Sequence, residues 1–277
     1  SKHLTSKKKK FTITGIICLL VMCGVLLTNG KTINKDESTL LLPIEKMNPQ
    51  YLDESISKAI IENYVISSDT GAEFNVESHV ILGKNEYDNF TEVYVVSTYG
   101  GYSFENNIFN LTNVSSNIPI RIKFSKSKEG YEYIESEVAK DGSMYKDSIL
   151  DTFPKKEAYL ALNNDYTNRL LKEVNKQAKA YVESINRKCE VTYNYVEKEY
   201  IEELALVDSS DMQELWDYPE WIGNREVLEN GKRYIYETQY DKSLNILTFI
   251  KLDENNTQIE MLQYEIGGNK LEKLNLK

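Results

Sequence analysis

The sequence predicts an α+β protein, with an N-terminal transmembrane helix followed by two antiparallel-sheet-plus-helix units. Three observations indicate this fold class. An uncharged apolar run fills residues 11–28. Stretches in which apolar and polar residues alternate, as they do in strands, occur on both sides of a helical block at residues 145–187. With 277 residues, 41% of them apolar, the chain is long enough to bury substantial cores.

The N-terminal segment has the pattern of a membrane anchor. Lys2 and Lys7–Lys10 place five positive charges and no acidic residue in the first ten positions. The following 18 residues, FTITGIICLLVMCGVLLT, would span about 27 Å as a helix. Because basic residues favour the cytoplasmic side, we expect a cytoplasmic tail at 1–10 and a single-pass anchor in the cell membrane at 11–28. The C-terminal part should then be extracytoplasmic.

Two other interpretations of this segment remain open. Leu20-Val21-Met22-Cys23-Gly24 resembles the lipobox of bacterial lipoproteins, in which case Cys23 would be acylated. Met22 departs from that pattern, which has a small residue at this position. In the third interpretation a signal peptide is cleaved near Thr28-Asn29-Gly30.

After a polar tether at 29–48, residues 49–155 predict a first α+β domain. Asn48-Pro49 is a typical helix start, and Leu52, Ile56 and Ile60 recur at helical spacing. Four runs typical of strands follow, which predict an antiparallel meander with the helix on one face. They lie at 74–82, 93–99, 118–124 and 131–138.

Residues 156–277 predict a long helix and a second antiparallel α+β domain. Apolar residues spaced three or four apart predict a helix at 165–187. Asn230-Gly231 tolerates the positive φ angles of a type I′ turn and predicts a hairpin. Further runs at 191–195, 234–240, 244–252 and 258–266 complete the predicted sheet.

Composition argues against several functions. The full chain has a net charge of -10, and the part after the basic first ten residues is acidic. An acidic protein repels the phosphate backbone, which disfavours binding to nucleic acid. His79 is the sole histidine outside the N-terminal tail, and three cysteines show no zinc-binding spacing. The sequence therefore predicts no cofactor and no metal, and it does not favour an enzyme based on histidine chemistry.

Carboxylates keep one enzymatic alternative open. Acidic residues cluster at Glu197, Glu199, Glu202 and Glu203, and a hydrolase needs only two carboxylates at a defined separation. A solvated acidic face is the favoured interpretation of this cluster. Asp253 begins a segment that superficially suggests a calcium loop, but Gln258 and Tyr264 occupy the positions of the required Gly and Glu. We expect a turn there.

Two aromatic groups are candidate ligand-binding residues. Tyr99, Tyr102 and Phe104 surround the flexible pair Gly100-Gly101, and Trp216 and Trp221 bracket a loop. Such rings could form a rim that recognises a sugar or a peptide, whereas core packing is the favoured interpretation of both groups.

Several segments resemble a known family. They are His79–Gly83, Thr91–Asn106, Ile118–Phe124, Asp141–Tyr145, Phe153-Pro154, Trp221–Glu226 and Asn230–Glu237. Together they are similar to the extracytoplasmic C-terminal domain of M56-peptidase (β-lactam-sensor-type) membrane regulators of low-GC Gram-positive bacteria. The multispan peptidase part and its zinc motif are missing, and Glu135–Lys140 replaces an expected aromatic-proline segment. The resemblance implies a regulatory module without proteolytic activity.

These observations predict a membrane-anchored extracytoplasmic sensing or binding protein of the bacterial cell envelope, without catalysis. A cytoplasmic tail of ten residues cannot house a signalling domain, so we expect the partner to be another membrane protein. The alternatives are a surface-anchored carboxylate-dependent hydrolase and a lipoprotein binding module acylated at Cys23.

Overall fold

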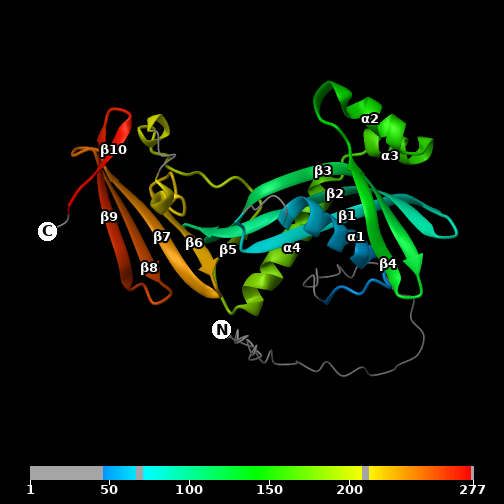
Figure 1. The fold of residues 1–277 in the computed structure, drawn as a ribbon, viewed down its shortest axis with the longest axis horizontal. Helices are drawn as coiled ribbons and strands as arrows, with labels where there is room; N and C mark the ends of the chain where they lie inside the picture. Colours follow the sequence, from blue (N-terminus) through cyan, green and yellow to red (C-terminus); the bar gives the residue numbers. More distant parts are fainter. Residues whose placement is uncertain (1–45, 67–70, 208–211, 276–277) are drawn as a thin grey trace, which may run out of the picture. The chain divides into compact units, whose positions relative to one another are not determined.

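The structure is a computed structural model that describes residues 46–66, 71–207 and 212–275 (Figure 1). Its helices are α1 (Leu52–Ile60), the π-helical turn η2 (Ile61–Val65), η4 (Gly142–Met144), α2 (Tyr145–Thr152), α3 (Lys155–Asn163), α4 (Thr167–Ser184), η5 (Leu204–Leu206) and η6 (Gln213–Leu215). Its strands are β1 (Phe74–Glu86), β2 (Phe90–Glu105), β3 (Ile108–Ser127), β4 (Gly130–Val138), β5 (Glu190–Thr192), β6 (Gly223–Glu229), β7 (Lys232–Asp241), β8 (Ile246–Asp253), β9 (Gln258–Gly267) and β10 (Lys270–Lys273).

A long hairpin of β2 and β3 organises the sheet. Asn106 and Asn107 adopt positive φ at its turn, a conformation that asparagine tolerates better than most residues. β1 pairs with one edge of β2, and β6 meets the same strand at its far end. β4 and the short parallel strand β5 both pair with β3. The order β10-β9-β8-β7-β6-β2-β3-β4 therefore forms one sheet, with β1 and β5 as side branches.

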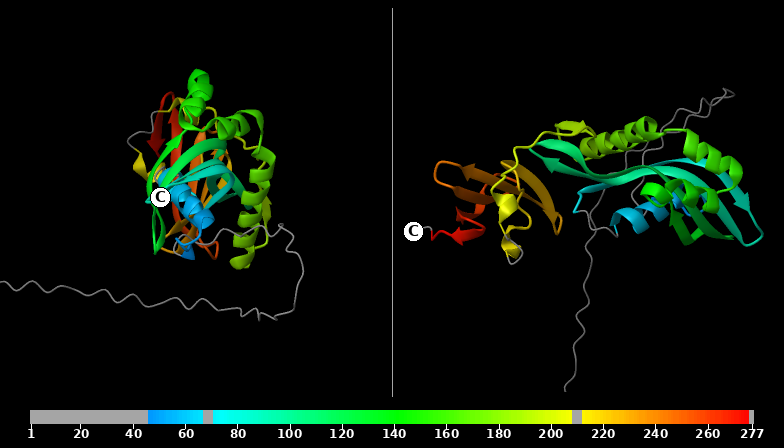
Figure 2. Two further views of the ribbon diagram at one scale, coloured as in Figure 1. Left: turned by 90° about the vertical axis from the view of Figure 1, so that its right-hand side faces the viewer. Right: turned by 90° about the horizontal axis from the view of Figure 1, so that it is seen from above.

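Helices cover both faces of the first part of this sheet. Successive strand residues point to opposite faces, so Val93 and Val95 of β2 contact α1, while Tyr94 and Val96 contact α2 and α3. α4 packs on β1, β2 and β3 through an apolar stripe that includes Val174. Figure 2 shows α1 on the side of the sheet opposite α3 and α4.

The later strands β6 to β10 form a meander with its own core. Leu247, Phe249 and Tyr264 are buried there, and the loop before β6 adds Leu215 and Tyr218. The predicted Asn230-Gly231 hairpin is present, with φ angles of 52° and 78°. The meander is joined to β2 by the single strand pair Glu105↔Arg225.

Ion pairs reinforce this junction. The Arg233 guanidinium contacts both oxygens of Glu73 at 2.6 Å and Glu226 at 3.0 Å. Arg187 contacts Glu226 from the other side, and both arginines lie over the ring of Phe104. The side chain of Glu73 is only 2% exposed. Because a buried carboxylate needs a partner, these contacts hold the junction together.

The predicted fold class is wrong. The structure is mostly one large antiparallel sheet rather than two sheet-plus-helix units, with 46% of the described residues in strands and 27% in helices. The long helix that was expected in the second unit is α4, and its apolar stripe packs on β1, β2 and β3. Among the described residues, the meander from β6 to β10 carries only the short turns η5 and η6.

The N-terminal transmembrane helix of the predicted fold is not seen among these elements. Residues 11–28 lie outside the described part of the chain, as do Cys23 and most of the tether. Within the described ranges, no helix combines the length and the apolar character that crossing a membrane requires.

Candidate functional site

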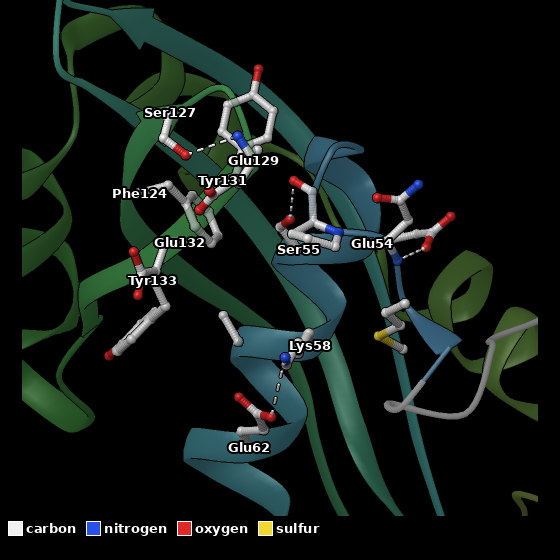
Figure 3. A pocket seen from close by; sticks show the side chains of 15 residues that line it. Glu54, Ser55, Lys58, Glu62, Phe124, Ser127, Glu129, Tyr131, Glu132 and Tyr133 are labelled. Carbon is white, nitrogen blue, oxygen red and sulfur yellow. Dashed lines mark hydrogen bonds and ion pairs between the residues drawn. The ribbon is translucent and has the colours of Figure 1, made fainter.

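A cavity of about 370 Å³ lies between α1 and the β3–β4 hairpin. Figure 3 shows α1 on one side of it and the hairpin residues on the other. Its lining residues are Met47, Asn48, Pro49, Glu54, Ser55, Lys58, Ala59, Glu62, Phe124, Ser127, Glu129, Gly130, Tyr131, Glu132 and Tyr133. The volume is near the lower end of the range for small-molecule sites, about 300–1,000 Å³.

The α1 wall is formed by residues spaced four apart. Glu54 and Lys58 of α1 and Glu62 of η2, which continues α1, therefore lie on one face. Ile56 and Ile60 lie on the opposite face and are fully buried against β2 and β3. Burial of the apolar face fixes the helix on the sheet, and the charged face is left open to the cavity.

Charges on this wall are partly committed to other groups. The Glu54 carboxylate accepts a hydrogen bond from the backbone N–H of Asn48 at 2.5 Å. The Lys58 ammonium lies 3.9 Å from Glu62, and both side chains are 46% exposed. At that separation and exposure the pair is weak, so both groups stay accessible to a ligand.

The hairpin wall adds aromatic rings and further carboxylates. The rings of Phe124 and Tyr131 lie 6.2 Å apart and nearly perpendicular, at 77°. Phe124 is buried as part of the core and Tyr131 is half-buried, so the rings form an apolar floor. Glu129 and Glu132 are exposed near the turn that joins the two strands.

Backbone contacts fix the hairpin against the segment before α1. The Tyr131 N–H donates to the Pro49 carbonyl oxygen at 2.7 Å. Gly130 has a φ of +119°, and a Cβ atom there would overlap the same carbonyl. Only glycine fits this close approach without strain, so the sequence at Gly130 helps to define the cavity.

Away from the cavity lining, a charge cluster with a buried His79–Glu77 pair ties α1 to β1. The imidazole of His79 contacts Glu77 at 3.1 Å through Nδ1 and Asp53 of α1 at 3.2 Å through Nε2. Ser97 donates to the same Glu77 carboxylate at 2.9 Å. Burial lowers the pKa of His79, but the charge of Glu77 and the contact with Asp53 outweigh burial and raise the pKa to about 10. The direct contact with His79 in turn lowers the pKa of Asp53.

This cluster connects α1 to β1 and is not suited to proton transfer. A general base must be neutral at working pH and reachable by its substrate. The side chains of His79 and Glu77 are 5% and 0% exposed, and the imidazole is held in its charged form. Across the described ranges, no group of three or more His, Cys, Asp or Glu side chains is arranged to hold a metal ion.

The structure separates the five aromatic residues predicted from sequence. Tyr102 and Phe104 are fully buried in the core under α4, so a ligand does not reach either ring. Tyr99 is half-buried, with its ring 5.7 Å from that of Tyr64. Trp221 is 7% exposed under the Lys198 ammonium, whereas Trp216 is 63% exposed. These side chains do not form one site.

The structure also shows the surroundings of the acidic segments that the sequence singled out. In the segment from Asp253, the carboxylate accepts the backbone N–H groups of Asn255 and Thr257, at 2.9 and 2.8 Å, which is the geometry of a turn. In the acidic cluster at 197–203, Glu203 lies 3.9 Å from Lys242, whose side chain is 83% exposed.

The residues that line the cavity were not predicted as binding residues from the sequence. The signal that could have found them is Tyr131-Glu132-Tyr133 after a turn, together with acids spaced eight apart on the preceding helix. Neither pattern says that the two segments face each other.

Comparison with known proteins assigns neither a family nor a function to this chain. No protein-family model, no curated protein and no solved structure matches this chain. The similarity to M56-type regulators therefore stays a prediction from the sequence segments.

Proposed function

We propose that this chain is a membrane-anchored, extracytoplasmic binding protein of the bacterial cell envelope with a sensing role, and that the cavity between α1 and the β3–β4 hairpin is its binding site. The observation that carries the proposal is the cavity itself, which has an apolar aromatic floor and a charged rim. Sites for small molecules are typically concave and apolar with a few polar groups at defined positions.

The surrounding chemistry favours binding over catalysis. The one histidine among the described residues is buried between two carboxylates. The cavity carboxylates lie on two separate walls, and all but the half-buried Glu54 are exposed. In this proposal the apolar segment 11–28 supplies the membrane attachment, and a second membrane protein receives the signal.

Native mass spectrometry of the full chain in detergent tests the binding site. The protein is incubated with a small-molecule extract of the cell envelope, and bound mass is recorded. Ser127→Trp places a large ring at the cavity rim. Ser143→Trp makes the same change at an exposed position of η4 outside the cavity and is the matched control. We expect one adduct on the wild type and the control, and its loss on Ser127→Trp.

Unfolding temperatures of the three proteins show that each is folded. An adduct retained by folded Ser127→Trp would place binding elsewhere and refute the proposed site. Absence of any adduct on all three proteins would also count against a binding function for this cavity.

A further inference from the structure

We infer that the ligand of this cavity is a small organic cation, with an ammonium or guanidinium group carried on an apolar or aromatic body. This inference rests on the proposed function, because it names the class of molecule that the same site takes. Three features of the cavity support it, namely its charge, the accessible tyrosine rings of its lining and its size.

The charge of the lining is strongly negative. Four carboxylates line the cavity against the single ammonium of Lys58. They belong to Glu54 of α1, Glu62 of η2, and Glu129 and Glu132 of the hairpin. A cation entering between the walls thus faces carboxylates on both sides. An anion of the same shape would be repelled by an excess of three negative charges.

The floor of the cavity suits a cation with an apolar body. Tyr131 is half-buried and Tyr133 on the same wall is 36% exposed, so both rings are open to a ligand. Phe124 is only 1% exposed and packs against Tyr131 from the core. The π face of an accessible tyrosine ring attracts an ammonium group. Burial of the ligand's hydrocarbon against Ala59 and the rings adds apolar contact.

The size of the cavity limits the ligand. A volume of about 370 Å³ lies within the range of sites that hold small molecules. Lys58 sits between Glu54 and Glu62 on the α1 wall and partly neutralises it, so its ammonium competes with the cation of the ligand.

The test uses three probes of matched shape on the full chain in detergent: 3-phenylpropylamine, 3-phenylpropanol and 3-phenylpropionate. Dissociation constants are measured by saturation-transfer NMR titration, and the signal of Ser127→Trp is subtracted as the micelle background. We expect the amine to bind most tightly and the carboxylate most weakly. Losing one unit charge at about 6 Å in water changes an affinity by about threefold.

Two sets of charge variants should move the amine affinity in opposite directions. Glu129→Gln with Glu132→Gln removes both hairpin charges, and we expect the amine to bind about tenfold more weakly. Lys58→Gln removes the competing ammonium, and we expect the amine to bind about threefold more tightly. The affinity of the neutral alcohol should stay the same in both, because only the charge is altered.

Equal affinities for the three probes, or an amine affinity unchanged by the paired glutamine substitutions, would overturn the inference. So would failure of the amine to bind the wild type above the Ser127→Trp background. If the envelope adduct is nevertheless lost only on Ser127→Trp, the cavity remains a binding site and the ligand class alone is wrong.

Discussion

The buried pair of His79 and Glu77 makes the stability of the protein depend on pH in a defined direction. We consider the double variant His79→Gln with Glu77→Gln, which replaces the ion pair with two neutral amides of similar shape. Replacing both partners leaves no isolated charge in the core, where it would add a cost of its own.

The magnitude follows from the pKa of His79. That pKa is about 10 in the folded protein against 6.5 for an ordinary histidine, and each pKa unit corresponds to about 1.36 kcal/mol. The free energy of unfolding should therefore be up to about 5 kcal/mol higher with His79 protonated than with His79 neutral. Because Asp53 is 66% exposed, solvent screens its part of the interaction with His79. We therefore expect the measured pH-dependent change in the free energy of unfolding to be about 3–5 kcal/mol.

The pH window follows from the direction of the shift. A group whose pKa is higher in the folded state stabilises fully below its unfolded pKa. The contribution of His79 is therefore complete below pH 6.5 and is lost as pH rises toward 10. We expect the difference in unfolding free energy between wild type and double variant to shrink by about 3–5 kcal/mol over this range.

Urea denaturation of the full chain in detergent at pH 6, 8 and 10 measures this difference. Other groups titrate in both proteins, so their contributions cancel in the comparison. NMR of the His79 ring gives a second measurement, with the signal assigned by its absence in the variant; its shift should stay constant from pH 5 to 9. A difference that is independent of pH, or a ring that titrates near pH 6.5, would refute the assignment of a buried imidazolium.

Three further outcomes are expected. Gly130→Ala brings a Cβ atom onto a carbonyl and should lower the free energy of unfolding by about 2–4 kcal/mol. Gly142→Ala, also at positive φ but with open space around it, should lower it by only about 1 kcal/mol. Equal losses in urea denaturation would contradict the close packing at Gly130. Arg233→Ala should cost about 3–5 kcal/mol because it unpairs a buried carboxylate, whereas Lys242→Ala in an exposed pair should cost under about 0.5 kcal/mol, both read from thermal unfolding. Replacing residues 11–28 with a polar linker should move the protein from the membrane pellet to the supernatant, and continued sedimentation would argue against that segment as the anchor.

Local elements could be predicted from the sequence, because their signals lie within a few residues. The helix expected at 165–187 is α4 at Thr167–Ser184, and the four runs expected in the first domain fall within β1 to β4. The sequence pattern did not predict a strand for the first half of β3. Phe109 and Leu111 alternate correctly there, but Asn and Thr residues between and after them resemble a loop.

Assembly of these elements could not be predicted. The stripe on α4 shows that one face is buried, but nothing in it selects β1–β3 over β6–β10 as the surface that buries it. The pairing of Glu105 with Arg225 joins residues 120 positions apart, and no local pattern encodes it. The cavity depends on a similar long-range meeting of α1 with the β3–β4 turn, which is why its residues were not among the candidates.

The single strand pair that joins the meander to β2 has a consequence for cooperativity. Strands β6 to β10 share hydrogen bonds with one another along most of their length. Their backbone contact with the β2–β3 hairpin is confined to the pair Glu105↔Arg225 and the hydrogen bonds between Asn106 and Asn224. A sheet that is continuous in hydrogen bonding can therefore open as two separate cooperative units. We expect amide protons of β8 and β9 to exchange with a common free energy of opening that differs from that of β2 and β3. A ligand that binds near α1 would raise protection in the β2–β3 hairpin and leave the exchange of the meander unchanged.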